Sequence, residues 1–123
     1  MPILDTSILI DFLKGRPEAA SIISSIPGSA LCTTIFNKYE LLRGSNKSDA
    51  AEVKELLGRL TIYEFSEESM EEAVRIYKDM KERGVTIGEF DVLIAAISSA
   101  NRELLYARDK DFEGVHSPYI KLV

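Results

Sequence analysis

Four acidic residues stand where the sequence indicates that a strand ends or a helix begins. The first follows a short apolar run, and an acid at the carboxyl end of a buried strand lies where open α/β sheets bind their ligands. Carboxylate oxygens are also the hard ligands that Mg²⁺ and Mn²⁺ prefer. If the fold gathers these four side chains, they form a site for divalent metal. They are Asp5, Glu40, Asp91 and Asp109.

Carboxylates that converge from separate elements suit the hydrolysis of a phosphodiester bond. A bound divalent metal lowers the pKa of a water molecule and neutralises charge on the attacked phosphate, and two ions about 3.5–4 Å apart can clamp the entering and leaving oxygens. Without metal, the clustered acids would repel one another and their pKa values would rise. The cation would therefore both stabilise the predicted site and serve its chemistry.

Each of the four acids also has a purely structural interpretation. Asp5 can cap the helix that follows it, Asp91 can complement a helix dipole, and Asp109 can cap the short segment after it. Glu40 can form a capping box with Asn37, with Asn37 as the N-cap and Glu40 at position N3. Taken singly, these interpretations stay open. The four acids as an ordered set favour a metal site.

The elements that must position these acids alternate along the chain. Short apolar strands alternate with amphipathic helices, a pattern typical of an α/β domain with a mainly parallel sheet. Because the carboxyl ends of parallel strands share one edge of a sheet, acids from separate elements can meet there. The candidate strands are Ile3–Asp5, Ala30–Thr33, Thr61–Phe65, Leu104–Ala107 and Tyr119–Leu122.

Helix signals fill the intervals between the strands. Pro17 suits the first position of a helix that ends before Pro27 and Gly28. Residues 39–60 contain a helical pattern that is interrupted at 44–46, which leaves either two helices or one broken helix.

Two later helices carry clearer signals. Residues 88–100 are apolar nearly all round, so we expect a central helix with Asp91 in its first turn. Ser66 can cap a helix that ends at Gly84. The predicted apolar face of that helix consists of Met70, Ala73, Val74, Tyr77 and Met80.

The composition bounds the kind of protein. With 123 residues and 46% hydrophobic content, we expect one domain over residues 1–123, with a real core. The longest apolar run is far short of a bilayer span, so we expect a soluble, cytoplasmic protein with no membrane association. The net charge of −5 argues against nucleic acid as a partner. That objection weakens if clustered acids make up most of the excess, because bound cations would reverse the local field.

No other catalytic constellation competes with the acids. Cys32 is the single cysteine and lies in an apolar run, which favours a buried structural thiol. His116 is the single histidine and precedes the last strand in a predicted turn, which favours a loop residue over a catalyst. A phosphatase with Asp5 as covalent nucleophile would need a second acid two residues later, where Ser7 stands.

The ordered motifs resemble those of PIN domains, and most closely those of VapC-like ribonuclease toxins from type II toxin–antitoxin pairs. Their order, spacing and the total length of the chain agree with that family, so the resemblance covers essentially the whole chain. The matching pieces are Leu4–Asp11, Tyr39–Gly44, Asp91–Ala96 and Ala107–Phe112.

The resemblance implies a fold and an activity. The fold is a three-layer α/β/α arrangement around a central, mainly parallel five-stranded sheet. The activity is that of an endoribonuclease that uses Mg²⁺ or Mn²⁺ to cleave single-stranded or looped RNA. The catalytic and metal-binding residues carried over from the family are Asp5, Glu40, Asp91 and Asp109.

The resemblance also implies supporting residues and partners. Thr6 and Ser7 match hydroxyl positions that hydrogen-bond a ligand carboxylate or water. Asp111 matches an auxiliary acid, for which a surface or capping role is the other interpretation. Arg43 and Arg108 are expected to contact RNA or an antitoxin. The partners implied are RNA, an antitoxin whose C-terminal segment lies along a groove, and a second copy of the chain in a homodimer.

Two positions depart from the family pattern. Ala107 stands where the family often has Thr, which removes a hydroxyl near the last acid, and Asn37 stands where Thr often precedes the glutamate by three residues. Two other functions stay open beside the toxin: a housekeeping RNA-processing nuclease, and a PIN-like module that binds RNA or protein without cutting.

Overall fold

The computed structural model describes residues 1–123 and contains one five-stranded sheet in which every neighbouring pair of strands is parallel. The strand order is β3-β2-β1-β4-β5. The predicted central, mainly parallel sheet is therefore confirmed, and it is parallel throughout. The strands are shorter than the predicted ranges: β1 (Ile3–Leu4), β2 (Cys32–Thr34), β3 (Thr61–Tyr63), β4 (Leu105–Ala107) and β5 (Ile120–Leu122).

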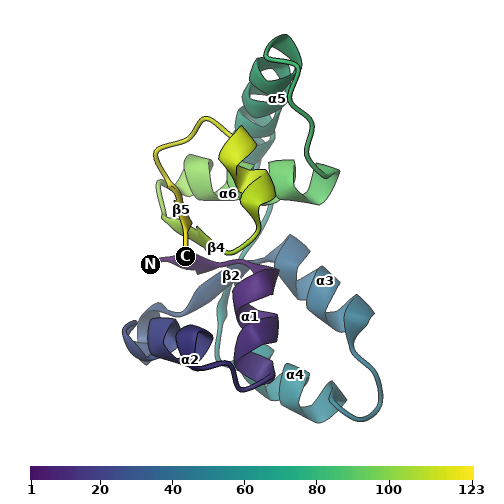
Figure 1. Ribbon diagram of the computed structural model, residues 1–123, viewed down its shortest axis with the longest axis vertical. Coiled ribbons are helices and arrows are strands. Elements are labelled where there is room, and N and C mark those ends of the chain that lie inside the picture. The colour runs from purple at the N-terminus through teal and green to yellow at the C-terminus, as the bar shows by residue number, and fades with distance from the viewer.

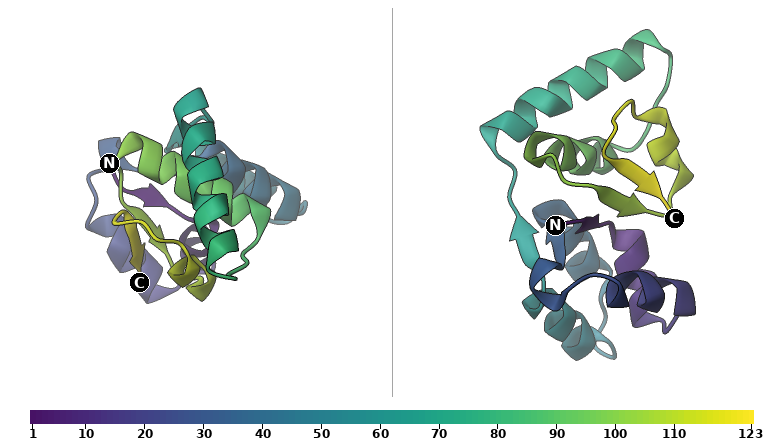
Figure 2. Two further views of the ribbon diagram at one scale, coloured as in Figure 1. Left: turned by 90° about the horizontal axis from the view of Figure 1, so that it is seen from above. Right: turned by 90° about the vertical axis from the view of Figure 1, so that its left-hand side faces the viewer.

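Helices cover both faces of the sheet, as Figures 1 and 2 show, which confirms the three-layer arrangement. Helices α5 (Glu67–Glu82) and α6 (Glu89–Asn101) lie on one side, and α1 (Thr6–Leu13), α2 (Pro17–Ser24) and α4 (Ala50–Gly58) lie on the other. Between the layers are two separate hydrophobic clusters, one on each face. The remaining helices are α3 (Ile35–Gly44) and the 3-10 helices η1 (Gly28–Ala30) and η2 (Lys110–Gly114).

Strand β1 joins the two halves of the core. Successive strand residues point to opposite faces, and Ile3 belongs to the cluster under α5 and α6 while Leu4 belongs to the cluster under α1, α2 and α4. Both side chains are fully buried. The strand pairs with β2 and β4, so it lies in the middle of the sheet. Asp5 follows at its carboxyl end, in the centre of that edge.

The beginning of α3 differs from the prediction. Thr34 is the N-cap, and its hydroxyl and the side chain of Asn37 close a capping box, with Asn37 at N3. Asn37 is therefore not the N-cap, and Glu40 lies in the second turn instead of at N3. The prediction was wrong because Thr34 is the last residue of β2, so the helix begins at once, without a linker. Residues 39–60 form parts of two helices, α3 and α4, which decides between the two alternatives.

Helix α5 is capped by Ser66 as predicted, but its buried face is rotated from the predicted one. The residues turned toward the core are Ser69, Ala73, Ile76 and Met80. Met70, Val74 and Tyr77 are exposed by 43%, 44% and 51%, so they do not contribute to the core. The apolar residues of α5 span nearly half a turn, and packing against α6 selects which of them are buried.

Other sequence-based expectations hold. Helix α6 buries seven of its residues and carries Asp91 in its first turn, and Pro17 begins α2. Cys32 is a fully buried free thiol that donates to the carbonyl oxygens of Met1 and Pro2. His116 is an exposed loop residue that lies 3.5 Å from Asp79 on α5. None of the helices combines the length and apolar character that crossing a membrane requires.

Candidate active site

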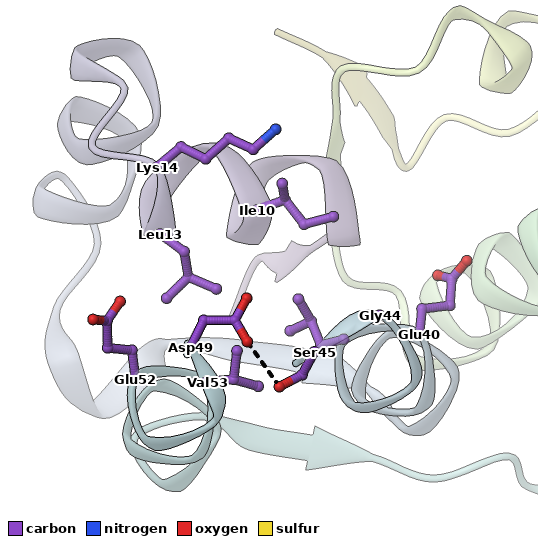
Figure 3. Close-up of a pocket in the computed structure, with 10 residues that line it drawn as sticks. Ile10, Leu13, Lys14, Glu40, Gly44, Ser45, Asp49, Glu52 and Val53 are labelled. Atoms are coloured by element: carbon purple, nitrogen blue, oxygen red, sulfur yellow. Dashed lines mark hydrogen bonds between the residues drawn. The ribbon is translucent and has the colours of Figure 1, made fainter. Parts of the chain in front are cut away.

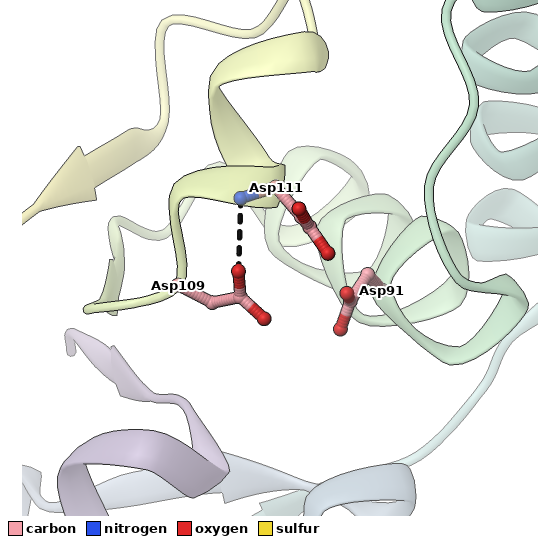
Figure 4. Close-up of side chains that lie close together, drawn as sticks. All are labelled: Asp91, Asp109 and Asp111. Atoms are coloured by element: carbon pink, nitrogen blue, oxygen red, sulfur yellow. Dashed lines mark hydrogen bonds between the residues drawn. The ribbon is translucent and has the colours of Figure 1, made fainter.

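Three carboxylates from two elements turn toward one another at the carboxyl edge of the sheet (Figure 4). Carboxylate oxygens of Asp91, Asp109 and Asp111 lie within 4.8 Å of one another. Asp91 comes from the first turn of α6. Asp109 caps η2 by accepting a hydrogen bond of 2.9 Å from the backbone N–H of Asp111. The turn that follows β4 therefore brings two acids opposite a third.

Asp5 is the most buried of the acids, with 5% of its surface exposed. It caps α1, and its Oδ2 accepts from the backbone N–H and the hydroxyl of Ser7 at 3.4 and 2.9 Å. Its Oδ1 accepts from Nδ2 of Asn37 at 3.0 Å. Burial raises the pKa of Asp5, and the hydrogen bonds to Ser7 and Asn37 oppose that rise because they favour the charged form. Capping and a role in the site are therefore compatible at this residue.

Glu40 is joined to the beginning of α1 by a hydroxyl. Thr6 Oγ1 donates to Glu40 Oε1 at 2.7 Å and accepts from Asn37 Nδ2 at 2.9 Å. The side-chain nitrogen of Asn37 thus donates to both Asp5 and Thr6, which are adjacent in the sequence. Glu40 and Asp5 are held in one network although 35 positions separate them in the sequence.

The pKa of Asp91 reflects the combined negative charge of the cluster. Its pKa is raised from the ordinary value of 3.8 to about 7, first by burial and then by the negative charges of Asp5, Asp109, Glu40 and Asp111. All four neighbours therefore lie close enough to oppose its ionisation. The fold brings the four predicted acids into one electrostatic cluster with a fifth acid, the solvent-exposed Asp111.

The donor set fits a hard divalent cation. The converging groups are carboxylates supported by hydroxyls and one amide, and neither the thiol nor the imidazole of the chain takes part. Oxygen ligands of this kind suit Mg²⁺, Mn²⁺ or Ca²⁺ and disfavour softer metals that prefer sulfur or imidazole. The residues suited to hold the ion are Asp5, Glu40, Asp91, Asp109 and Asp111.

Two contributors to this site were undervalued in the sequence. The family resemblance predicts an auxiliary role for Asp111, yet its carboxylate lies in the tightest group with Asp91 and Asp109. Asn37 was interpreted as a helix cap, although its amide reaches Asp5. The sequence signal for this role is the spacing of Thr34 and Asn37, which fits a capping box that begins at Thr34. Such a box places Asn37 in the first turn of α3, where its side chain faces the end of β1.

The two arginines expected to contact a ligand are placed differently. The guanidinium of Arg108 pairs with Asp11 at 3.0 Å, while its backbone N–H donates to Ser7 Oγ at 3.2 Å. Arg43 lies on the exposed side of α3, with its guanidinium over the rings of Tyr39 and Phe90 at 5.1 and 5.7 Å from their centroids. Arg43 therefore has no acidic partner, whereas the guanidinium of Arg108 is paired with Asp11.

Two hollows adjoin the acids. One beside Asp91 is lined by Glu40, Gly88, Glu89, Phe90 and Asp91. The other is a groove of about 260 Å³ between α1, α3 and α4, which begins at Glu40 and is shown in Figure 3. Its apolar lining comes from Ile10, Leu13, Leu41 and Val53.

The sheet and its acids define an α/β protein with a carboxylate site at the carboxyl edge of a parallel sheet. The chain belongs to the PIN domain family, whose model matches residues 3–117. It is similar to Ribonuclease VapC2 of Haemophilus influenzae, with 30% identity over 119 residues that cover 91% of this chain and 89% of that protein. Ribonuclease VapC1 of Methanocaldococcus jannaschii is 28% identical over 109 residues, covering 88% of this chain and 75% of that protein.

Solved structures share the fold. The DNA-bound VapBC from Salmonella typhimurium superposes with a TM-score of 0.85 and 21% identity, over 99% of this chain and 96% of that one. A toxin–antitoxin complex from Klebsiella pneumoniae gives a TM-score of 0.82 and 24% identity, over 98% of this chain and 96% of that one. The expected resemblance to VapC-like PIN proteins is thereby confirmed.

Proposed function

We propose that this protein is a divalent-metal-dependent endoribonuclease that cleaves single-stranded or looped RNA and acts as the toxin of a toxin–antitoxin pair. The observation that carries the proposal is the convergence of four other carboxylates around Asp91 at the carboxyl edge of the sheet. The similarity to proteins named Ribonuclease VapC over about nine-tenths of the chain supports the choice of RNA as substrate.

Asp5, Glu40, Asp91 and Asp109 are the proposed ligands of Mg²⁺ or Mn²⁺, with Asp111 beside them. When bound, the ion supplies Lewis-acid activation of water and charge neutralisation at the phosphate. The acids would hold it from four elements, at the beginnings of α1, α6 and η2 and in α3. Near neutral pH without a cation, Asp91 retains a proton in a large fraction of molecules, so cation binding releases that proton.

The hydroxyls around the acids orient them. Ser7 donates to Asp5 Oδ2, Asn37 donates to Asp5 Oδ1, and Thr6 donates to Glu40 Oε1, so both carboxylates are held by hydrogen bonds from the protein. Hydrogen bonds of this kind would fix the orientation of the carboxylates toward a bound ion. We assign Thr6 and Ser7 this supporting role and place Arg43 as the arginine that contacts RNA phosphate or a partner's acidic group, because no carboxylate pairs with it.

The proposal is tested by cleavage of single-stranded RNA by purified protein with Mg²⁺, with Mn²⁺ and with EDTA. Asp5→Asn and Asp91→Asn should each lower the rate at least 100-fold, since each removes a ligand charge while keeping the shape of the side chain. Glu82→Gln on the exposed side of α5 is the matched control and should keep full activity. Equal cleavage by wild type and Asp5→Asn, or cleavage unaffected by EDTA, would contradict the proposal.

The groove between α1, α3 and α4 supports an antitoxin as protein partner. It combines apolar walls with the charged side chains of Lys14, Asp49 and Glu52 and extends to Glu40, so a segment lying in it would reach the edge of the acidic cluster (Figure 3). The test is to express the product of the neighbouring reading frame and measure whether it stops RNA cleavage at a one-to-one ratio. If no small neighbouring protein inhibits, a housekeeping RNA-processing nuclease becomes the better description.

A homodimer is the second proposed assembly. Exposed apolar side chains on α3 and α5 support it, because a monomer gains nothing from leaving them in water. Sedimentation equilibrium at micromolar concentrations should give twice the mass of the chain, and a monomer at all concentrations would contradict it. The exposed side chains are Ile35, Tyr39 and Leu42 on α3 and Met70, Val74 and Tyr77 on α5.

A PIN-like module that binds without cutting is the remaining alternative. Tight binding of Mn²⁺ by the wild type together with no turnover of any RNA would favour it over the nuclease.

A further inference from the structure

Asn37 is a polar side chain with no exposed surface, in the first turn of α3. An amide buried without partners is destabilising, because it loses its hydrogen bonds to water, so such a residue needs hydrogen bonds within the protein. The protein provides them, since no buried side-chain nitrogen or oxygen lacks a partner. A residue of this kind in the core calls for a reason beyond packing.

Every polar atom of the Asn37 side chain is engaged. Its Oδ1 accepts from the hydroxyl and the backbone N–H of Thr34 at 2.7 and 3.3 Å. Its Nδ2 donates to Asp5 Oδ1 at 3.0 Å and to Thr6 Oγ1 at 2.9 Å. The Thr6 hydroxyl in turn donates a hydrogen bond to Glu40 Oε1 at 2.7 Å. One amide therefore connects the end of β2 with two of the acids.

The direction of these hydrogen bonds is fixed by the acids. Ionised carboxylates only accept, so the nitrogen of Asn37 must face Asp5, and the Thr6 proton must go to Glu40. The oxygen of Thr6 is then left to accept from Asn37. If the Asn37 amide were turned around, the hydrogen bond to Asp5 would be lost, and so would the hydrogen bond to Thr6 that supports Glu40.

We propose that Asn37 is a positioning residue for the metal ligands: it orients Asp5 directly and Glu40 through Thr6, and so raises the affinity of the site for a divalent cation. This inference rests on the proposed function and deepens it. The competing interpretation is that Asn37 only closes the capping box of α3. A threonine at position 37 has one hydroxyl proton and could not donate to Asp5 and Thr6 together.

The experiment is a calorimetric titration of Mn²⁺, without RNA, into wild type, Asn37→Thr, Thr6→Val and the double variant. Each single change should weaken Mn²⁺ binding about 10-fold or more, as is usual for groups that support metal ligands. The double variant should be no more than about 3-fold weaker than either single variant, because both changes break one chain of hydrogen bonds. Melting temperatures in EDTA are measured in parallel.

Ser66→Ala is the control for loss of a helix cap. The Ser66 hydroxyl accepts from the N3 backbone N–H of α5 as the Thr34 hydroxyl does in α3, but its hydrogen bonds are to Ser69 and to none of the acids. It should lower the melting temperature and leave the affinity for Mn²⁺ unchanged. Thr6→Val keeps the cap of α3 intact, so it tests the proposal even if Asn37→Thr fails to fold.

The outcomes separate the two proposals. Wild-type affinity for Mn²⁺ in Asn37→Thr or in Thr6→Val, or strictly additive losses in the double variant, would overturn the positioning role and leave the nuclease proposal standing. Failure of the wild type to bind Mn²⁺ or Mg²⁺ at all would overturn the proposed metal-dependent activity itself.

Discussion

The backbone N–H of Arg108 donates to the hydroxyl oxygen of Ser7 over 3.2 Å, across 101 positions of the chain. The same hydroxyl donates to Asp5 at 2.9 Å. The end of β4 is thereby fastened to the acid at the end of β1, and the residue after Arg108 is Asp109. This serine is therefore one of the contacts that set the spacing of two proposed ligands, beside the backbone N–H of Asp5, which donates to the carbonyl oxygen of Tyr106 at 2.9 Å.

Ser7→Ala should therefore loosen the site without removing an acid. We expect a loss of about 1–2 kcal/mol in the free energy of unfolding, because a part-buried N–H and a carboxylate each lose a partner. The rate of RNA cleavage should fall about 10-fold, which is the usual effect of removing a residue that supports a metal ligand. Urea denaturation and cleavage rates check both values. Ser7→Thr keeps the hydroxyl and should stay near wild type; equal behaviour of Ala and Thr variants would show that the hydroxyl does not matter.

Asp91 should make the metal-free protein less stable as the pH rises. Its pKa in the folded protein is about 7 against an ordinary 3.8, so from about pH 4 upward the unfolded chain ionises this residue while the folded protein resists. Below pH 3.8 the protonated Asp91 makes its whole contribution to the free energy of unfolding. That contribution is lost progressively as the pH rises to about 7, the pKa of Asp91 in the folded protein. Asp91→Asn removes this penalty.

The measurement is thermal melting in EDTA at pH 5 and pH 8. The Asn variant should exceed the wild type by about 3–6 °C at pH 8 and by less at pH 5, since about 1 kcal/mol after solvent screening corresponds to a few degrees. Added Mn²⁺ should reverse the order at pH 8, because only the wild type gains from the ion. An equal difference at both pH values would argue against the assigned pKa.

Cys32 should be unreactive in the folded protein. Burial raises the pKa of its thiol to about 11, so only about one thiol in a thousand is ionised at pH 8. We expect labelling by an aromatic disulfide reagent to take hours in buffer and seconds in concentrated urea. Fast labelling under native conditions would mean that the first strand opens readily from β2.

Two glycines provide a matched pair for backbone strain. Gly84 has a φ of +69°, and a methyl group there would meet no atom within 4 Å, so Gly84→Ala tests strain alone. It should lose about 1 kcal/mol of unfolding free energy. Gly58 ends α4 without a positive φ and also has open space, so Gly58→Ala should gain about 0.5–1 kcal/mol. Chemical denaturation of both variants checks the signs, and similar effects in both would contradict this account.

The placement of several acids followed from local sequence alone. An acid after the apolar run of β1 and an acid opening an apolar helix are visible because strand ends and helix starts have local chemical signatures. The rotation of α5 could not be found in this way. Its apolar residues cover a wide arc, and the residues that reach the core were decided by packing against α6.

By itself the sequence determined the parallel α/β pattern, the order of the motifs and the places of Asp5, Asp91 and Asp109 at the beginnings of helices, because periodicity and capping act over a few residues. Only the tertiary structure decided that Asp111 joins the tightest group and that Asn37 spans Asp5 and Thr6. Those relationships depend on which strand ends are neighbours in the sheet and on side-chain directions in the core. Both are properties of contacts between residues far apart in the chain, which local patterns do not encode.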